Sequence, residues 1–363
     1  MAALHAGIPA QTSINTVNRQ CSSGLTAINQ IANQIRVGQI DIGIGESSCI
    51  RLFDPLRQTV RLLGAGVESM TNGFGPRAIP EFSEEVLQIQ EAEDCLIPMG
   101  ITSENVAKEF NISRQTQDEF AAKSFQKAAA ANKAGKFKAE IVPIKAKFID
   151  PKTEKVVQIV VDQDDGIRDG VTAASLAKLK PAFSKDGSTH AGMLYAFIHP
   201  SILNILFPGN ASQVSDGAAA VLLARRSTAK RLGLPIVGKY VAAATVGVPP
   251  RIMGVGPAYA IPRVLELTGL SLNDIDFFEI NEAFASQAVY SVQHLGIPFE
   301  KVNINGGAIA IGHPLGCSTS SYLFFFFFFL NVVLTSFFFF SWCSSSCDWY
   351  EYCQANRWKG VYY

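Results

Sequence analysis

Hydrophobic residues recur at helical spacing in the stretch that follows residue 22. The positions that form this stripe are Leu25, Ile28, Ile31, Ala32 and Ile35. Steps of three and four residues place them on one face of an α-helix. Ser22 or Ser23 can cap the amino end of this helix, and Gly38 follows its last turn. The pattern therefore predicts a helix between these serines and Gly38, with one buried face.

Extended segments alternate with further helices along the rest of the chain. The predicted strands cover residues 11–18, 40–45, 65–70, 218–223, 239–246 and 274–280, and a β-rich patch lies at 141–161. The predicted helices cover residues 103–110, 114–134, 259–268 and 282–294. The run at 218–223 is continuously apolar, as in a strand that is covered on both faces. Strands alternating with helices predict an α/β layered fold with buried mixed sheets.

Three segments break this pattern. Residues 46–64 interrupt a strand that resumes at residue 65, residues 193–209 are apolar without a strand or helix period, and the tail from residue 319 is rich in phenylalanine. By length, residues 322–342 of this tail could span a bilayer. Nothing upstream indicates a membrane protein, so we expect low-complexity sequence without selected structure, and a membrane anchor stays the alternative.

Charge and cysteine usage exclude several classes of function. The 31 basic and 31 acidic residues cancel, and no run of Lys and Arg indicates nucleic-acid binding. The seven cysteines are Cys21, Cys49, Cys95, Cys317, Cys343, Cys347 and Cys353. Their irregular spacing in a long chain does not form a disulfide framework and favours a reducing compartment, and it lacks the pairs and histidines of a zinc site.

Cys21 is the candidate nucleophile. It lies at the amino end of the predicted 22–37 helix, where unpaired N–H groups and the positive end of the helix dipole favour a thiolate and lower the thiol pKa. A thiolate can form a covalent intermediate. The alternative is that Cys21 is a small buried residue at a tight junction between strand and helix, because free cysteines commonly pack rather than react.

Three short motifs carry a resemblance to a known family. Residues 18–24 read Asn-Arg-Gln-Cys-Ser-Ser-Gly, residues 281–284 read Asn-Glu-Ala-Phe, and residues 306–316 read Gly-Gly-Ala-Ile-Ala-Ile-Gly-His-Pro-Leu-Gly. In this order and spacing they resemble the thiolases, which exchange acyl groups between an enzyme thiol and coenzyme A. Residues 95–106 are similar to the subtype found in peroxisomes. The resemblance covers most of residues 1–318.

The resemblance implies a particular architecture. The expected fold is a thiolase-like layered αβαβα fold, built from two similar halves with an inserted loop domain. The first half covers residues 1–226 with the loop domain at about 72–190, the second covers 235–318, and 319–363 form the Phe-rich tail outside the family. Both halves are expected to be incomplete at the termini. We interpret 46–64 and 193–209 as foreign, intron-derived insertions.

The resemblance also assigns roles to residues. The thiolate of Cys21 attacks the 3-keto carbonyl of a 3-ketoacyl-CoA, His313 takes the thiol proton and helps to stabilise the oxyanion, and Asn281 holds a water that completes the oxyanion site. Carbon–carbon cleavage releases acetyl-CoA, and a second coenzyme A collects the shortened acyl group. Met99 and the glycines around His313, Gly307 and Gly312, are expected binding residues. The resemblance implies a homodimer, coenzyme A as co-substrate, and neither a permanently bound cofactor nor a metal.

This sequence departs from the family pattern at one catalytic position. The family has a second cysteine, in a glycine-rich loop, that acts as acid and base on the acetyl carbanion, and no such motif occurs here. General acid–base help is worth about 10²- to 10⁴-fold in rate. We therefore expect impaired activity in this chain.

Several alternatives stay open. A biosynthetic acetoacetyl-CoA thiolase is the alternative to an enzyme of fatty acid β-oxidation, and a non-catalytic remnant that pairs with a full-length thiolase is another. The resemblance favours the peroxisome, with a mitochondrial or cytosolic location as alternatives. No targeting signal is recognised, because the chain ends Val-Tyr-Tyr and Met1 begins no apolar signal region.

Overall fold

The computed structural model gives the fold in defined stretches of the chain. It describes residues 5, 10, 14–45, 48–54, 59–64, 66–69, 83–149, 155–190, 209–317 and 332–342. Of the segments interpreted as foreign, most of 46–64 lies within these stretches. In 193–209 only Gly209 does.

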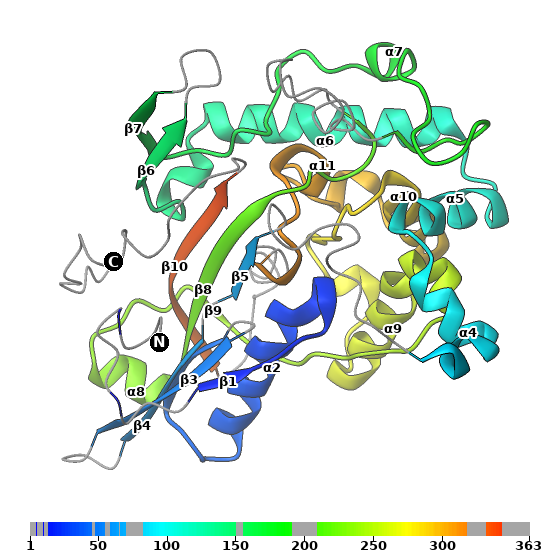
Figure 1. Ribbon diagram of the computed structural model, residues 1–363. Helices are drawn as coiled ribbons and strands as arrows, with labels where there is room; N and C mark the ends of the chain where they lie inside the picture. The colour runs from blue at the N-terminus through cyan, green and yellow to red at the C-terminus, as the bar shows by residue number, and fades with distance from the viewer. Residues whose placement is uncertain are drawn as a thin grey trace.

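An eight-stranded sheet crosses the molecule (Figure 1). Its strands are β1 (Ile14–Thr16), β2 (Ile42–Gly45), β3 (Ser48–Asp54), β4 (Thr59–Gly64), β5 (Gly66–Ser69), β8 (Asp216–Arg225), β9 (Gly238–Lys239) and β10 (Val332–Trp342). The spatial order is β1-β3-β4-β2-β8-β10-β9, and β5 also pairs with β8. The apolar run predicted at 218–223 is confirmed as the middle of β8, which has neighbours on both sides.

Helix α2 (Ser23–Arg36) packs on this sheet with four of the five predicted stripe positions, while Leu25 is half-buried and lies outside the buried cluster. Its stripe residues Ile28, Ile31, Ala32 and Ile35 form a buried cluster with Ile40, Val221, Leu223 and Tyr240. A 3-10 turn, η1 (Gln20–Ser22), precedes the helix, and Gly38 follows it with φ +79°. The expected serine cap is not made: Ser22 occupies the capping position without a side-chain bond. Ser23 Oγ instead accepts from Arg19 N (2.8 Å) and donates to Gln20 O (2.7 Å), which closes the preceding turn.

Strands β2 and β5 lie on one line along β8. Gly45 of β2 pairs with Val221, and Gly66 of β5 pairs with Ala219. A single β8 position, Ala220, separates the two pairings, so a single residue would suffice to join β2 to β5. The chain instead makes the β3–β4 hairpin between β2 and β5. Strand β4 pairs in parallel with the edge of β2 that faces away from β8.

The same hairpin separates β1 from β2. β1 pairs antiparallel with β3, β3 antiparallel with β4, and β4 parallel with β2, so β1 and β2 run in the same direction. Together with α2 they have the connectivity of a β-α-β unit, in which consecutive parallel strands are commonly neighbours. The β3–β4 hairpin occupies the position between them.

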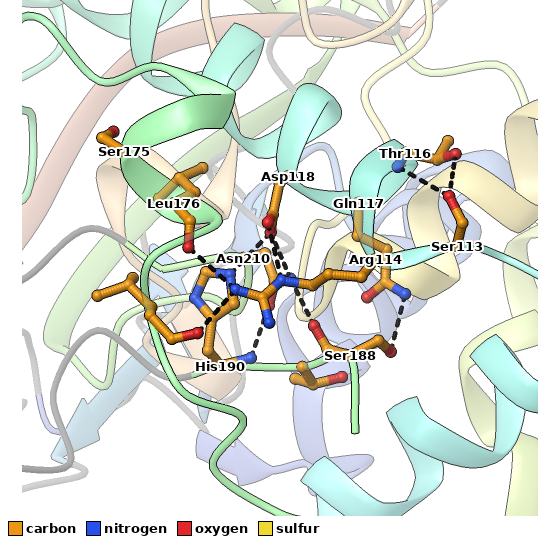
Figure 2. Close-up of polar contacts among 12 residues, drawn as sticks. Ser113, Arg114, Thr116, Gln117, Asp118, Ser175, Leu176, Ser188, His190 and Asn210 are labelled. Carbon is orange, nitrogen blue, oxygen red and sulfur yellow. Dashed lines mark hydrogen bonds and ion pairs between the residues drawn. The ribbon is translucent and has the colours of Figure 1, made fainter. Parts of the chain in front are cut away.

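The described residues on either side of 191–208 are held together. Asn210 N donates to His190 O (3.2 Å), and His190 N donates to Asn210 Oδ1 (2.8 Å). Figure 2 shows both side chains converging on Asp118, whose Oδ1 lies 2.7 Å from His190 Nε2 and accepts from Asn210 Nδ2 (3.0 Å). Arg114 Nε donates to the other carboxylate oxygen (2.7 Å). This cluster holds His190 and Asn210 next to each other, although 19 residues separate them in the sequence.

The region from 83 to 190 is mainly helical. Its helices are η3 (Glu84–Gln88), α4 (Gln90–Glu93), η4 (Asp94–Leu96), α5 (Met99–Glu109), α6 (Arg114–Lys133), η5 (Lys136–Ala139) and α7 (Ala173–Leu176), and β6 (Ile144–Ile149) pairs with β7 (Val156–Val161). The predicted 114–134 helix is confirmed, and Ser113 Oγ accepts from Thr116 N (3.1 Å) as its cap. The β-rich patch is confirmed as the β6–β7 hairpin. Helix α5 begins before the predicted residue 103, directly after Pro98, whose carbonyl accepts the first helical bonds.

The second half differs from the sequence prediction at its strands. Helix α8 (Arg226–Arg231) lies between the two halves, and the helices of the second half are η6 (Pro250–Val255), α9 (Gly256–Thr268), η7 (Leu272–Asp274), α10 (Ala285–Leu295), η8 (Phe299–Lys301) and α11 (Ala308–Ile311). The strand predicted at 239–246 is limited to β9, because its partner β10 begins at Val332. At 274–280 the described chain has only an isolated bridge from Phe278 to Val302, since Asn303 (φ +46°) turns the backbone away. The helix predicted from residue 282 starts at Ala285, because Phe284 is extended and bridges to Ala211.

Residues 332–342 of the Phe-rich tail form a strand, contrary to the expectation of a tail without structure. β10 lies between β8 and β9 and pairs antiparallel with both. Aromatic and β-branched residues fit a pleated surface well, and β8 offers an open edge for pairing. In the part of the chain that the structure describes, no helix is long and apolar enough to cross a membrane.

The main hydrophobic core lies under α6. Helix α10 packs against α5, α6 and α9, and α11 packs against α6 (Figure 1). Phe125, Ala288, Val289 and Ile309 are fully buried members of this core. This core includes Ile280, next to the second sequence motif, and Ile309 and Ala310, within the third.

Candidate active site

Asn281 and His313 meet in the structure. The Nδ2 atom of Asn281 lies 3.2 Å from Nε2 of His313, although the two residues are 32 positions apart. The His313 side chain is 3 % exposed, and this burial lowers its pKa to about 4. The imidazole is therefore neutral at physiological pH and able to accept a proton. Asn281 Oδ1 is buried without a hydrogen-bond partner in the described part of the chain.

The loop that carries His313 is built for close approach of the backbone. Gly306 has φ +85°, and a Cβ there would lie 2.6–2.7 Å from atoms of α6. Gly312, at the end of α11, has φ +97°, a conformation that residues with a side chain rarely adopt. His313 N then donates to Gln213 O (3.2 Å). The predicted close-approach loop is therefore present, and its glycines set the path of the backbone into His313.

Gln213 ties this loop down from a second side. Its Nε2 lies 3.1 Å from the carbonyl oxygens of Gly166, Ile309 and Ala310. The side chain thus bridges the loop domain and α11, while the backbone oxygen holds His313. Sequence reasoning did not select Gln213, because a lone glutamine carries no pattern that distinguishes it.

A second residue that sequence reasoning missed is Glu282, the neighbour of Asn281 in the Asn-Glu-Ala-Phe motif. Its side chain is 1 % exposed. Burial raises the pKa of Glu282, while hydrogen bonds from Ser124, Asn303 and Ile309 act in the opposite direction. Membership of the motif was the available signal, but it did not indicate which of the four residues would be buried.

Cys21 lies on a different element from Asn281 and His313, in the turn that precedes α2. It is the middle residue of η1, directly before α2, and its side chain is partly exposed. The preceding residue, Gln20, has φ +45°, a left-handed conformation that is strained for a residue with a side chain. Gln20 N donates to Asn18 Oδ1 (2.9 Å), which helps to hold this turn. The amino end of the 14-residue α2 favours negative charge next to Cys21.

The expected binding residues lie on separate elements. Gly307 caps α11 and Gly312 ends it, so both belong to the His313 loop. Met99 opens α5, and its side chain is 41 % exposed. The structure thus joins Asn281, His313, Gly307 and Gly312 in one pair of adjoining loops, whereas Cys21 and Met99 are contributed by α2 and α5.

Two further cysteines, Cys317 and Cys95, lie in different environments. Cys317 is fully buried and packs against Ala219 and Ile141. Cys95 is exposed, and its Sγ lies 3.4 Å from Glu91 O. Within the described ranges, no group of three or more His, Cys, Asp and Glu side chains is arranged to hold a metal ion.

An α/β layered fold with a cysteine at a helix amino terminus and a buried neutral histidine defines a candidate enzyme of the covalent, cysteine-dependent class. Comparison with known families identifies which one. The model of the thiolase N-terminal domain matches residues 1–46 and 57–196, and that of the thiolase C-terminal domain matches residues 234–344. The chain belongs to the thiolase family, whose members are acyltransferases.

Similar proteins include several peroxisomal thiolases. The chain is 56 % identical to the peroxisomal 3-ketoacyl-CoA thiolase of Yarrowia lipolytica over 317 residues, which are 87 % of this chain and 68 % of that protein. It is 54 % identical to peroxisomal 3-ketoacyl-CoA thiolase A of Mus musculus over 313 residues, 86 % of this chain and 65 % of the mouse protein.

Solved structures agree with the predicted architecture. The dimeric peroxisomal thiolase of Saccharomyces cerevisiae matches with a TM-score of 0.68 and 52 % identity, covering 85 % of this chain and 67 % of that one. A second structure of the yeast 3-ketoacyl-CoA thiolase, described as five α-β-α-β-α layers built from two core domains of identical topology, matches with a TM-score of 0.60 and 44 % identity, covering 89 % of this chain and 68 % of that one. The prediction of a thiolase-like layered fold is confirmed.

Proposed function

We propose that this chain is an acetyl-CoA C-acyltransferase, which cleaves a 3-ketoacyl-CoA with coenzyme A to acetyl-CoA and a shortened acyl-CoA in fatty acid β-oxidation. The observation that carries the proposal is the contact between Asn281 and the buried, neutral His313. It brings together two of the three motifs of the family. The names of the relatives from Yarrowia and mouse support the same substrate class.

The residues divide the first half of the reaction between them. Cys21 attacks the 3-keto carbonyl, so a bond forms between its sulfur and the carbonyl carbon while the thiol proton passes to His313. Burial keeps His313 neutral above about pH 4, so its imidazole has an unprotonated nitrogen for this transfer at physiological pH, and the same burial makes it a weaker base than a free imidazole. Asn281 holds a water that, together with His313, stabilises the oxyanion, and such a donor is worth roughly 3–4 kcal/mol in other enzymes.

The second half transfers the acyl group to coenzyme A. The bond between C2 and C3 of the substrate breaks, and the acetyl-CoA carbanion takes a proton before it leaves. Coenzyme A then attacks the thioester on Cys21 and releases the shortened acyl-CoA. In the family a second cysteine serves the carbanion.

Binding and assembly follow the family in this proposal. Met99 lines the channel for the pantetheine arm, while Gly307 and Gly312 shape the loop that faces the thioester. The chain acts as a homodimer, because the similar yeast thiolase structure is described as dimeric. It acts in the peroxisome, because the names of its relatives place them there. Coenzyme A and 3-ketoacyl-CoA are its small-molecule partners.

Acetylation of Cys21 by acetyl-CoA tests the proposal without requiring a complete turnover. In this half-reaction the acetyl group moves from the sulfur of coenzyme A to that of Cys21, and the released thiolate takes the cysteine proton. We expect peptide mass spectrometry to find one acetyl group on Cys21, and none in Cys21→Ser. Transfer that is absent, or that occurs with equal yield in Cys21→Ser, would overturn the proposal. A profile of acyl chain lengths then separates a β-oxidation enzyme from an acetoacetyl-CoA thiolase.

A further inference from the structure

The carboxyl group of Glu282 accepts hydrogen bonds from three residues, one on α6 and two within residues 303–309. It accepts hydrogen bonds from Ser124 Oγ (2.6 Å) on α6, from Asn303 Nδ2 (2.6 Å), and from Ile309 N (3.2 Å) on α11. Glu282 itself stands next to Asn281. One buried group therefore connects the Asn281 loop with both the core helix and the helix that leads to His313.

The contact with α11 is tight and is relayed by a second group. Gly307 N donates to Ser124 Oγ (3.0 Å), and Ser124 Oγ donates to Glu282. A Cβ on Gly307 would lie 2.2–2.5 Å from the carboxyl atoms of Glu282, so this glycine leaves just enough room for the carboxyl group. The carboxyl group and the start of α11 fix each other's position.

The Asn281 loop is also held from its other side. Asn303 accepts from Ile280 N (2.8 Å) and donates to Ile280 O (2.8 Å), while its Nδ2 donates to Glu282. Asn281 lies between Ile280 and Glu282, so both of its covalent neighbours are anchored. Its side chain has little freedom to move away from His313.

We propose that Glu282 is a positioning residue, which holds the loop of Asn281 against the loop of His313 and thereby sets the contact between their side chains. This inference rests on the proposed function for its effect on catalysis, but the geometry that it describes can be tested separately. Glu282 does not touch the reacting atoms in this assignment. It acts through the two loops.

Two variants remove different parts of the clamp. Glu282→Gln keeps the shape but replaces one acceptor oxygen with an amide donor, which opposes the donors around it. Ser124→Ala removes the relay from α6 and leaves the motif intact. Glu104→Gln is the matched control, because Glu104 also accepts several bonds, from the backbone and side chain of Ser188 and from Thr189 N, but holds a different loop.

The first measurement follows the histidine and needs no activity. NMR correlation spectra of the imidazoles, assigned with His313→Asn, give the pH midpoint of His313 in the full chain. A loosened loop admits water, so we expect the midpoint to rise from about 4 toward the ordinary value of about 6.5 in both clamp variants but not in Glu104→Gln. A midpoint that stays at the parent value in both Glu282→Gln and Ser124→Ala would overturn the inference.

The second measurement follows Cys21. At saturating acetyl-CoA we expect both clamp variants to acetylate Cys21 roughly 10- to 100-fold more slowly, because small misplacements of catalytic groups have effects of this size. The half-saturating acetyl-CoA concentration should stay near the parent value. An unchanged rate in an acetylated parent overturns the inference. If the parent is not acetylated at all, the proposed function fails, and the midpoint of His313 alone decides on the clamp.

Discussion

Deleting residues 46–64 is expected to leave a continuous strand in register with β8. Gly45 would then be followed by Ala65 and Gly66, and Ala65 would face Ala220, the one β8 position between the two existing pairings. The deletion also removes the β3–β4 hairpin, so β1 can become the direct parallel neighbour of β2. The perturbation therefore tests the hypothesis that these 19 residues are an insertion.

The expected magnitude comes from loop closure. Closing a loop of this length costs about 2.6 kcal/mol of chain entropy, since the cost grows as 1.5 RT times the logarithm of the length. The hairpin also pairs with β1 through β3 and with β2 through β4. Direct pairing of β1 with β2 in the shortened chain replaces these two edges, so their loss does not offset much of the gain. For a chain of this size, about 2.6 kcal/mol corresponds to a rise of about 3–4 °C in Tm.

Deletions of neighbouring length supply the control. Removing 46–63 or 46–65 shifts the register of β5 on β8 by one residue, and a slip of one residue exchanges the two faces of a strand. In calorimetry we expect both of these chains to have a lower Tm than the chain that lacks residues 46–64. The reasoning is refuted if the 46–64 deletion melts below the parent, or if all three deletions melt at the same temperature.

Four further outcomes follow from the described geometry. Gly170→Ala, at φ +73° in open space, should lower the free energy of unfolding by about 1–2 kcal/mol. Gly306→Ala, at φ +85° against atoms of α6, should add about 1–3 kcal/mol of overpacking to that, so equal losses in urea unfolding would contradict the model of the loop. The pKa of His313 is about 6.5 in the unfolded chain and about 4 in the folded chain, so the folded state disfavours the protonated imidazole. The neutral form therefore contributes on the order of 3 kcal/mol to the free energy of unfolding, which is complete above about pH 6.5 and is lost as pH falls through about 4. His313→Gln should flatten that part of the profile of stability against pH. Ser113→Ala should cost about 1 kcal/mol in thermal unfolding by removing the cap of α6, and a change below about 0.5 kcal/mol, the low end for peptide helices, would contradict that role.

Local patterns predicted the elements that depend on local physics. The hydrophobic stripe of α2 and the Ser113 cap of α6 could be predicted from the sequence, because helix periodicity and capping depend on residues a few positions apart. The strands at 239–246 and 274–280 were over-predicted, since a strand needs a partner and the sequence of one segment does not say where its partner ends. Residues 332–342 were under-predicted for the same reason.

The sequence by itself determined which chemical groups this protein can bring to a reaction. Cys21, Asn281 and His313 are recognisable from their motifs because those motifs combine the residue type with the turn or glycine loop that presents it. The sequence also determined the family, and the matches to the N-terminal and C-terminal thiolase domains confirmed it.

Only the tertiary structure decided how those groups are arranged and held. The contact between Asn281 and His313, the burial that keeps His313 neutral, and the bond between Ser124 and Glu282, which are 158 positions apart, all depend on chain segments that meet only on folding. The alignment of β2 and β5 on β8 likewise exists only in the folded sheet. Desolvation and pairing are properties of the surroundings of a residue, and distant parts of the chain supply those surroundings.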